Sequence, residues 1–267
     1  MQPMVNIAVR AARAAGDIIV RNMDRLDRLK VVTKQNNDFV SNVDHMAEEI
    51  IITTIKEAYP DHGIIAEESG TQSEQSDFQW IIDPLDGTTN YLHGFPQFAV
   101  SIALQHKGRL EVGVIYDPIA QELFTASRGN GAMLNDKKIR VTGHKGLTNA
   151  LIGTGFPYCD QSYLDIYLET MKEMMQKTAG LRRPGSAALD LAWLAAGRID
   201  GFWEFNLKAW DIAAGALIVR EAGGIVSDFE NRDGYLKSGD IIAAAPKVFP
   251  EMIKIIQEKV NASDYLK

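Results

Sequence analysis

The segment WIIDPLDGTTN, at residues 80–90, joins an apolar run to two acidic residues on a Pro-Leu turn and a Gly-Thr-Thr stretch. The apolar run predicts a buried strand that ends at Asp83, followed by a turn that carries Asp86. Carboxylates supply the oxygen ligands that hard cations prefer, and the turn that follows presents backbone N–H groups to an anion. We interpret this segment as a metal site beside a phosphate site.

Composition allows a large folded core and excludes several classes of protein. The chain has 267 residues, 46% of them apolar, with a formal net charge of −7 and one cysteine, Cys159. One cysteine cannot form an intramolecular disulfide, which favours a cytoplasmic location. Charges interrupt the apolar N-terminal stretch, so we expect no signal peptide and no membrane span. The acidic balance argues against broad nucleic-acid binding and leaves room for a local basic patch.

Hydrophobic periodicity divides the chain into two halves. A helix is expected at about residues 5–20, a polar loop at 25–37, and a second helix from Ser41 or Asn42 to Tyr59-Pro60. Strands follow at 64–66, 79–82, 98–106, 110–116 and 122–127. From about residue 150, short strands alternate with helices near 162–177, 186–196, 212–222 and 248–260. We expect an α+β half at 1–146 and an α/β half at 147–267, which together form one catalytic unit.

Acidic residues also stand at the ends of other predicted elements. Glu67 and Glu68 follow a strand, Asp211 precedes a helix, and Asp44 lies in a helical first turn. Each has a purely structural explanation, because turns and helix N-termini favour acids. Their combination with the Asp-Pro-Leu-Asp turn favours Mg²⁺, which binds carboxylates, phosphate oxygens and water. The five histidines lack the spacing of a zinc site.

Three signatures resemble the inositol monophosphatase family, a group of lithium-sensitive, magnesium-dependent phosphatases. They are IIAEES at 64–69, WIIDPLDGTTN at 80–90 and WDIAAGALIVREAGG at 210–224. NDFVSNVD at 37–44 and GSAALDLAWLAAGRIDGFWE at 185–204 extend the similarity over nearly the whole chain, closest to the bacterial members. The resemblance implies a five-layered αβαβα sandwich, shared with fructose-1,6-bisphosphatase, and a homodimer.

The resemblance also implies a set of metal ligands. Glu67, Asp83 and the carbonyl of Leu85 look like ligands of one Mg²⁺. Asp83, Asp86 and Asp211 look like ligands of a second ion, so that Asp83 bridges the two. A third, more weakly held ion would share Glu67.

Four further residues are implied to act around the metal ligands. Thr88, hydrogen-bonded toward Asp44, would orient the attacking water and help to deprotonate it. Glu68 and Lys34 would lie next to the metal ligands and support them. The alternative for Glu68 is an ordinary surface acid.

Substrate contacts are implied for small and acidic residues of both halves. They are Gly87, Thr88, Gly185, Ser186, Ala187, Glu204 and Asp211. The residue types alone also allow Ser186 to be a helix N-cap and Glu204 to be an exposed strand acid. A polyol ring suits these hydroxyl partners better than a bisphosphate, which needs more positive charge in the pocket.

The leading hypothesis is an enzyme that hydrolyses myo-inositol monophosphate to inositol and phosphate, with two to three Mg²⁺ ions per site. One alternative is a bisphosphate phosphatase acting on fructose 1,6-bisphosphate or 3′-phosphoadenosine 5′-phosphate. Another, implied by the bacterial members, is a non-enzymatic role in ribosomal RNA transcription antitermination with RNA polymerase and Nus factors. The sequence shows no direct nucleic-acid motif, and it leaves open the physiological substrate, the metal affinity and the oligomeric state.

Overall fold

The computed structural model describes residues 2–24, 31–35, 38–73, 75–158, 160–263 and 265. At residue 2, at residues 31–35 and at residues 38–40 the description covers the backbone alone. Cys159 lies outside the described residues. Within them, no helix combines the length and the apolar character that crossing a bilayer requires.

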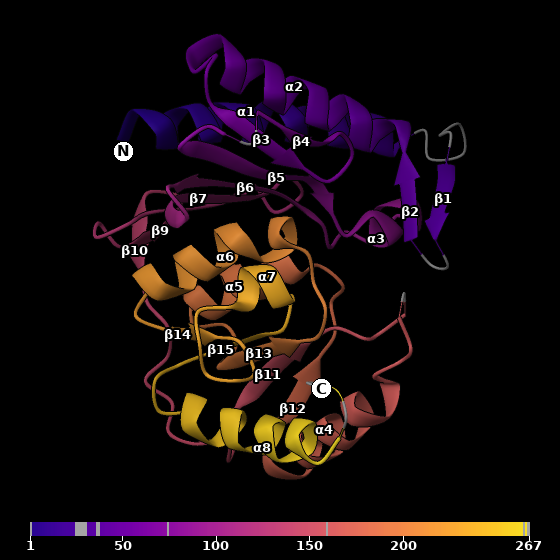
Figure 1. Ribbon diagram of the computed structural model, residues 1–267, viewed down its shortest axis with the longest axis vertical. Helices are drawn as coiled ribbons and strands as arrows, with labels where there is room; N and C mark the ends of the chain where they lie inside the picture. Colours follow the sequence, from indigo (N-terminus) through magenta and orange to yellow (C-terminus); the bar gives the residue numbers. More distant parts are fainter. Residues whose placement is uncertain are drawn as a thin grey trace.

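Helices and sheets are stacked in five layers (Figure 1). The order is an outer helix pair, an eight-stranded sheet, a central helix pair, a five-stranded sheet and a second outer helix pair. The helix pairs are α1 (Gln2–Met23) with α2 (Asn42–Ala58), α5 (Ala187–Ala195) with α6 (Ala209–Glu221), and α4 (Leu164–Lys177) with α8 (Phe249–Asn261). The predicted αβαβα sandwich is confirmed.

The eight-stranded sheet has the order β10-β9-β8-β7-β6-β5-β3-β4 and is antiparallel except between β3 and β5. Its strands are β3 (Gly63–Ala66), β4 (Gly70–Gln72), β5 (Phe78–Asp86), β6 (Ala99–His106), β7 (Arg109–Asp117), β8 (Glu122–Ser127), β9 (Ala132–Leu134) and β10 (Lys137–Ile139). In β5, Trp80 and Ile82 pack with α1 and α2, whereas Ile81 packs with α5 and α6. Helices cover both faces of the sheet, and this explains why the strand is apolar without alternation.

The five-stranded sheet has the order β12-β11-β13-β15-β14. Its strands are β11 (Leu151–Thr154), β12 (Gly180–Arg182), β13 (Gly201–Glu204), β14 (Ile225–Ser227) and β15 (Ile241–Ala244). β11 lies parallel to both of its neighbours, and the other pairs are antiparallel. The remaining elements are the hairpin of β1 (Val31–Gln35) and β2 (Asp38–Ser41) and the short helices α3 (Thr88–Leu92) and α7 (Tyr235–Ser238).

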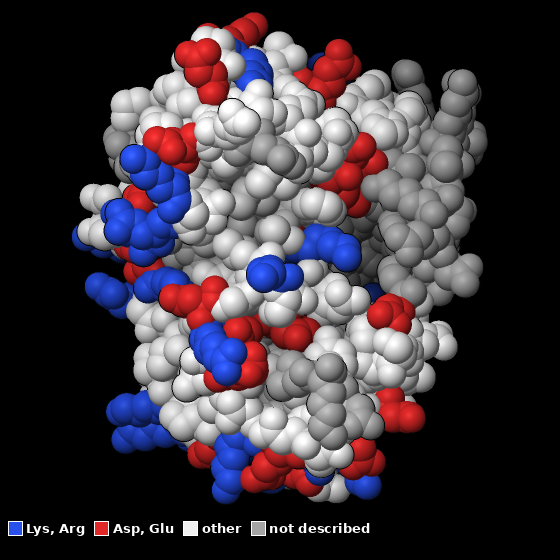
Figure 2. Space-filling model, viewed as in Figure 1, with Lys and Arg blue, Asp and Glu red and all other residues white. Residues whose placement is uncertain are grey.

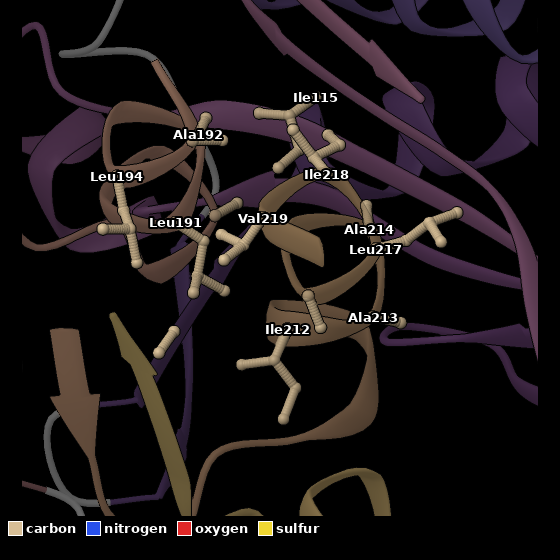
Figure 3. Close-up of a cluster of buried hydrophobic side chains, with 14 of the residues drawn as sticks. Ile115, Leu191, Ala192, Leu194, Ile212, Ala213, Ala214, Leu217, Ile218 and Val219 are labelled. Atoms are coloured by element: carbon tan, nitrogen blue, oxygen red, sulfur yellow. The ribbon is translucent and has the colours of Figure 1, made fainter. Parts of the chain in front are cut away.

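The central helices α5 and α6 are apolar on almost every side because sheets enclose them from above and below. Leu191 of α5 and Val219 of α6 belong to one buried cluster (Figure 3). The two helices approach closely at Gly215, where an added Cβ would lie 2.5 Å from the Cβ of Leu191. The tight contact fixes the N-terminal ends of both helices relative to the sheet.

Replacing Leu191 by alanine is expected to lower the free energy of unfolding by about 2–5 kcal/mol, because the residue is fully buried and its removal leaves a cavity. Urea unfolding followed by circular dichroism measures the change. Ile119→Ala removes a side chain that is 39% exposed and serves as the control. It is expected to change stability by no more than about 0.5 kcal/mol. Equal losses in the two variants would contradict this assignment of the core.

Two expectations about local structure were wrong. Residues 31–35, expected within a polar loop, form β1, which pairs with β2; residues 25–30 and 36–37 lie outside the described residues. This pairing depends on cross-strand hydrogen bonds that periodicity in a polar segment does not reveal. The helix expected at 212–222 begins earlier, at Ala209, so Asp211 lies within its first turn rather than before it.

Besides β1 and β2, four short strands were not predicted: β4, β9, β10 and β12. Each has three residues, which is too few to show an alternating pattern. The other helices of the second half are confirmed within a few residues as α4, α5 and α8. The division of the chain at residues 146 and 147 stays a prediction.

Candidate functional site

Strand β5 changes its pairing at the Asp-Pro-Leu-Asp segment. Asp83 pairs with Ser101 of β6 and Asp86 with Ala99, so two residues of β5 stand opposite one residue of β6. The N–H of Leu85 donates to Asp83 Oδ1 at 3.0 Å, which closes the turn. This bulge is the local reason why two acids lie side by side at the end of a buried strand.

Negative charge from three separate segments acts on Asp83. Burial raises the pKa of Asp83 well above its usual range, and the charges of Glu67, Asp86 and Asp211 raise it further. Burial likewise raises the pKa of Asp211, with Asp86 and Glu67 contributing. The acids after β3, in β5 and in α6 therefore form one electrostatic cluster. We call Glu67, Asp83, Asp86 and Asp211 the acidic cluster.

Asp86 connects the acidic cluster to the start of α5. Its Oδ2 accepts hydrogen bonds from Ser186 Oγ at 2.6 Å and from the N–H of Ala188 at 2.7 Å. Loss of hydration raises the pKa of Asp86 to about 6, and these hydrogen bonds oppose the rise. Ser186 is also the N-cap of α5, since its Oγ accepts from the N–H of Leu189. The structural explanation of Ser186 is thus confirmed, and the residue also contacts the cluster.

Asp211 is fixed by its place in the first turn of α6. Its Oδ2 accepts the N–H of Lys208 at 2.7 Å, as an acid at this position of a helix commonly does. The hydroxyl of Ser101 donates to the carbonyl of Trp210 at 3.1 Å, and Ser101 is the pairing partner of Asp83. Sequence analysis missed Ser101, which ties α6 to the bulge. A serine inside an apolar strand was the available signal.

Glu67 and Glu68 follow β3, and a buried acid of α2 supports their turn. Both oxygens of Glu48, which is 4% exposed, accept backbone N–H groups, from Glu68 at 2.8 Å and from Ser69 at 2.9 Å. The N–H of Glu67 itself donates to the carbonyl of Ile82 at 3.2 Å, which ties the turn to β5. Sequence analysis missed Glu48, although an acid on the apolar face of a helix was a usable signal.

Thr88 lies between Asp44 and the Asp-Pro-Leu-Asp turn. Its Oγ1 is 2.9 Å from Asp44 Oδ1 and 3.0 Å from the carbonyl oxygen of Leu85, and its single proton can serve one of them at a time. Ser41 donates to Asp44 Oδ2 through both its N–H (2.8 Å) and its Oγ (2.6 Å). Ser41 is the N-cap of α2, so the capping contacts that begin this helix also fix Asp44. The expected contact between Thr88 and Asp44 is present.

Two turns of the site require glycine. Gly87 has φ +99° and Gly185 has φ +97°, in the left-handed region that favours glycine. A Cβ at Gly87 would lie 2.8 Å from the carbonyl oxygen of Gln97, and one at Gly185 would lie 2.8 Å from Asn90 Nδ2. Asn90 Nδ2 donates to the carbonyls of Gln97 (2.7 Å) and Pro184 (2.8 Å). One asparagine of α3 therefore joins the segment that follows α3 to the turn before α5.

Glu204, at the end of β13, borders a small hollow beside the cluster. The hollow has a volume of about 110 Å³ and its lining includes Gly155, Phe156 and Tyr167. Gly155 leaves space for the acid, because a Cβ there would lie 1.8 Å from Glu204 Oε1. Burial raises the pKa of Glu204 to about 8, against the effect of Arg183. The interpretation of Glu204 as an exposed strand acid is wrong.

Arg183 and Asp190 also belong to this region, and sequence analysis did not assign them to it. The Arg183 guanidinium lies over the rings of Phe156 (5.3 Å) and Tyr158 (5.0 Å). Asp190 is 2% exposed, and its Oδ1 has no hydrogen-bond partner among the described residues. Burial raises the pKa of Asp190 well above its usual range, as do the charges of Glu204 and Asp86. Nothing in the residue order predicts this contact between α5 and β13.

The donor set of the acidic cluster suits a hard divalent cation. Within the described residues, no three acidic, histidine or cysteine side chains are placed as a closed coordination cage. Asp83 Oδ1 and Asp211 Oδ2 are occupied by backbone N–H groups, whereas Asp83 Oδ2 and Asp211 Oδ1 accept no hydrogen bond from described residues. Carboxylate oxygens without donors, held near other negative charges, are stabilised by a cation. The residues therefore fit Mg²⁺ in ligand type and charge.

Lys34 and Glu68 were expected to support the metal ligands, and neither is assigned a contact with the acidic cluster. Lys34 lies in β1, and its side chain is outside the described part of the chain. Glu68 is partly exposed, and its described contact with the site is the backbone hydrogen bond to Glu48. Their expected supporting roles stay predictions.

Comparison with known proteins places this chain in a family. The model of the inositol monophosphatase family matches residues 1–261. A putative Nus factor SuhB of Neisseria meningitidis serogroup B is 55% identical over 261 residues, covering 97% of this chain and 100% of that protein. The Nus factor SuhB of Escherichia coli K12 is 50% identical over 268 residues, covering 100% of both. The crystal structure of the extragenic suppressor protein suhB from Bartonella henselae matches with a TM-score of 0.93 at 44% identity, covering 96% of this chain and 99% of that chain. The chain therefore belongs to the inositol monophosphatase family.

Proposed function

We propose that this chain is an Mg²⁺-dependent phosphomonoesterase that hydrolyses myo-inositol monophosphate to inositol and phosphate. The observation that carries the proposal is the acidic cluster, in which Asp86 of the same strand and Glu67 and Asp211 of two other segments act on Asp83. The cluster adjoins the first turn of α3, where no side chain caps the first N–H groups, and such groups favour an anion. Membership of the inositol monophosphatase family supports the same chemistry.

In this proposal two Mg²⁺ ions are held by oxygen ligands from both halves of the chain, with one carboxylate shared between them. The ligands are Glu67, Asp83, the carbonyl of Leu85, Asp86 and Asp211. When bound, the ions supply positive charge that offsets the phosphate dianion and lowers the pKa of the attacking water. A third, weaker ion would share Glu67, and sensitivity to Li⁺ belongs to the same proposal.

Thr88 and Asp44 orient the attacking water and move its proton. Thr88 Oγ1 accepts a proton from the water while it passes its own proton to Asp44 Oδ1, 2.9 Å away. The two hydrogen bonds from Ser41 hold the other oxygen of Asp44 in place. No covalent intermediate with the protein is required.

The hydroxyl groups of the substrate are assigned to Glu204 and to the turn at Gly185, Ser186 and Ala187. A carboxyl group whose pKa is raised to about 8 is protonated at neutral pH, so it can both donate and accept hydrogen bonds with a polyol. Ser186 already donates to Asp86, which brings this turn next to the acidic cluster. The arrangement supports a polyol monoester over a bisphosphate, which would need more positive charge here.

Glu204→Ala is expected to raise KM for inositol 1-phosphate about 10-fold, which corresponds to the loss of one hydrogen bond. The KM for glycerol phosphate, which lacks the ring hydroxyls, is expected to change less than about 2-fold. Steady-state phosphate release measures both constants. Glu230→Ala, at an exposed acid paired with Arg232, is the control. Equal KM values for wild type and Glu204→Ala would contradict the assignment.

The test of the proposal is phosphate release from inositol 1-phosphate, with Mg²⁺ and after its removal by a chelator. Release that requires Mg²⁺ is the expected result. Fructose 1,6-bisphosphate and 3′-phosphoadenosine 5′-phosphate are assayed beside it. Faster turnover of either bisphosphate would replace the proposed substrate, and no release from any of the three would refute the enzymatic proposal.

A second candidate function is assembly with RNA polymerase and Nus factors in the cytoplasm. The observation that favours it is the set of relatives at 50–55% identity that are named as Nus factors. Asp83→Asn is expected to lose phosphatase activity and to retain these partners in a pull-down, because a binding role does not need the metal. If the wild type captures neither RNA polymerase nor a Nus factor, this candidate is removed.

We also propose that the chain forms a homodimer through the face of α4 and β12. Leu168 and Met175 of α4 are 46% and 58% exposed, and β12 is an edge strand of its sheet. A hollow of about 410 Å³ that Met171, Met175 and Leu181 help to line lies on this face. Large exposed apolar groups favour contact with another protein surface. Light scattering tests the state: the wild type is expected to be a dimer and Leu168→Glu with Met175→Glu a monomer, and a monomeric wild type would contradict it.

A further inference from the structure

A strip of basic side chains follows β10 and the connection from β10 to β11. The sequence KKIRVTGHKG at 137–146 contains four Lys or Arg residues and no acid, in a chain of net charge −7. Lys247 adjoins it, because its carbonyl accepts a hydrogen bond from the N–H of Gly146 at 3.0 Å. We call this set the basic strip; its members are Lys137, Lys138, Arg140, Lys145 and Lys247.

The cations of the basic strip are not neutralised by the rest of the described protein. Arginines elsewhere on the surface form ion pairs, as Arg198 does with Glu122 and Arg232 with Glu230. No member of the strip forms a salt bridge with any acid in the described ranges. Their charge is therefore available to an external anion.

Three of the acids that border the strip accept hydrogen bonds from the protein itself, while the exposed Asp136 stands next to Lys137. Glu221 accepts two backbone N–H groups of the β8–β9 loop, both at 2.8 Å. Glu251 accepts the N–H of Leu147 at 3.1 Å, and Asp200 accepts the hydroxyl of Thr142 at 2.6 Å. These carboxylates hold the loops in place, and none of them forms an ion pair with a described member of the strip.

Two adjoining hollows lie along the strip. One, of about 370 Å³, is lined in part by Lys138, Arg140 and Arg220, and the other, of about 310 Å³, in part by Arg140, His144 and Lys247. Arg140 and Gly223 line both, so the two hollows are neighbours. Figure 2 shows Lys and Arg side chains gathered along the left edge of the molecule, where β9 and β10 lie in Figure 1.

We infer that the basic strip binds the phosphate backbone of a nucleic acid. Successive phosphates each carry a negative charge, so a row of unpaired cations matches them and releases counterions on binding. The segment 137–147 contains no Phe, Tyr or Trp on which bases could stack, so the contact is made with the backbone. A membrane surface fits less well, because none of the large apolar side chains exposed in the described part belongs to the strip.

The basic strip is separated from the acidic cluster. β10 and β5 stand five strand spacings apart in the sheet, which at about 4.8 Å each is about 24 Å. Binding at the strip and hydrolysis at the cluster can therefore be tested independently. The inference stands whether or not the proposed phosphatase activity is found.

Fluorescence anisotropy with a labelled 20-nucleotide single-stranded RNA tests the inference in the full-length protein. The strip variant carries Lys138→Gln, Arg140→Gln and Lys145→Gln. At 0.1 M salt it is expected to bind about 10- to 100-fold more weakly than wild type, and the slope of log affinity against log salt is expected to fall by about 2. A wild-type circular dichroism spectrum and an unchanged Tm show that the variant is folded.

The matched control removes three exposed lysines elsewhere, with Lys172→Gln, Lys237→Gln and Lys254→Gln. It is expected to bind RNA within about 2-fold of wild type, since distant surface charges are largely screened. Equal losses in the two triple variants, or no measurable RNA binding by wild type, would overturn the inference. Anionic lipid vesicles form a second arm: binding that depends on the strip with vesicles and not with RNA would also overturn it.

Discussion

Asp83→Asn is expected to lower the turnover of inositol 1-phosphate at least about 1,000-fold, since loss of residues that merely support metal ligands already costs about 10- to 100-fold. Asp83 is the proposed bridging ligand, and neutralising it removes the charge that both ions share. The fold should persist, because asparagine has nearly the same shape and its Oδ1 can still accept the N–H of Leu85. Phosphate release at saturating Mg²⁺ measures the loss.

The same variant has a readout that does not depend on activity. Because the pKa of Asp83 is raised in the folded protein, its ionised form destabilises the fold at neutral pH. Asp83→Asn removes this repulsion, so its Tm in the presence of a chelator is expected to be equal to or above that of wild type. Mg²⁺ is expected to raise the Tm of the wild type and to raise that of the variant much less.

A matched control for Asp83→Asn is Asp117→Asn, at another buried acid of the same sheet. Asp117 Oδ1 accepts the N–H groups of Ile119 and Ala120, and burial raises the pKa of Asp117 as well. Its removal is expected to affect stability and to leave turnover per folded molecule unchanged. Near-normal turnover by Asp83→Asn, or an equal loss in the control, would contradict the role of the acidic cluster.

The residues that could be predicted are those whose proposed role is indicated by a local sequence pattern. The segment at 80–90 joins a buried strand to a turn that carries two acids, and the structure places both beside Glu67 and Asp211. The contact between Thr88 and Asp44, which are 44 residues apart, was expected from the family resemblance and is present. Periodicity gave the long helices because a stripe of apolar residues is a local property.

The residues that were missed act through tertiary contacts whose partners no local pattern identifies. Glu48 holds the turn after β3 from 20 residues away, and Ser101 ties α6 to the bulge of β5 from 109 residues away. A glutamate on the apolar face of a helix and a serine in an apolar strand each indicate a buried polar contact, but the sequence does not say with which segment. Asp190 and Arg183 were not assigned to the hollow because their relation to Glu204 exists only once α5 packs on the small sheet.

The basic strip is a second case in which a tertiary contact could not be predicted from the sequence. The sequence contained the segment 137–146, and net charge left room for a local basic patch. What the sequence could not show is that neighbouring acids such as Glu221 and Glu251 are occupied by backbone N–H groups. A count of charges treats every carboxylate as a possible partner for a cation. In the folded protein, the positions of the side chains determine which cations form ion pairs.

Thr88→Val is expected to lower kcat for inositol 1-phosphate by about 100- to 10,000-fold with little change in KM, the range typical of losing a positioned proton-transfer group. Valine has nearly the volume of threonine but cannot accept a proton from water or donate one to Asp44. Thr88→Ser keeps the hydroxyl and is expected to retain most of the activity. Steady-state kinetics separates kcat from KM for each variant.

Thr89→Val is the matched control for this experiment, because Thr89 is the adjacent residue in α3 and is exposed. It is expected to keep kcat within about 2-fold of wild type, as surface substitutions usually do. A purely structural role for Thr88, as a donor that braces the carbonyl of Leu85, would lower thermal stability and kcat together. A proton-transfer role lowers kcat at unchanged Tm, so the two quantities measured on one preparation distinguish the two roles. A Thr88→Val protein with wild-type kcat would remove Thr88 and Asp44 from the mechanism and leave the acidic cluster to act on the water alone.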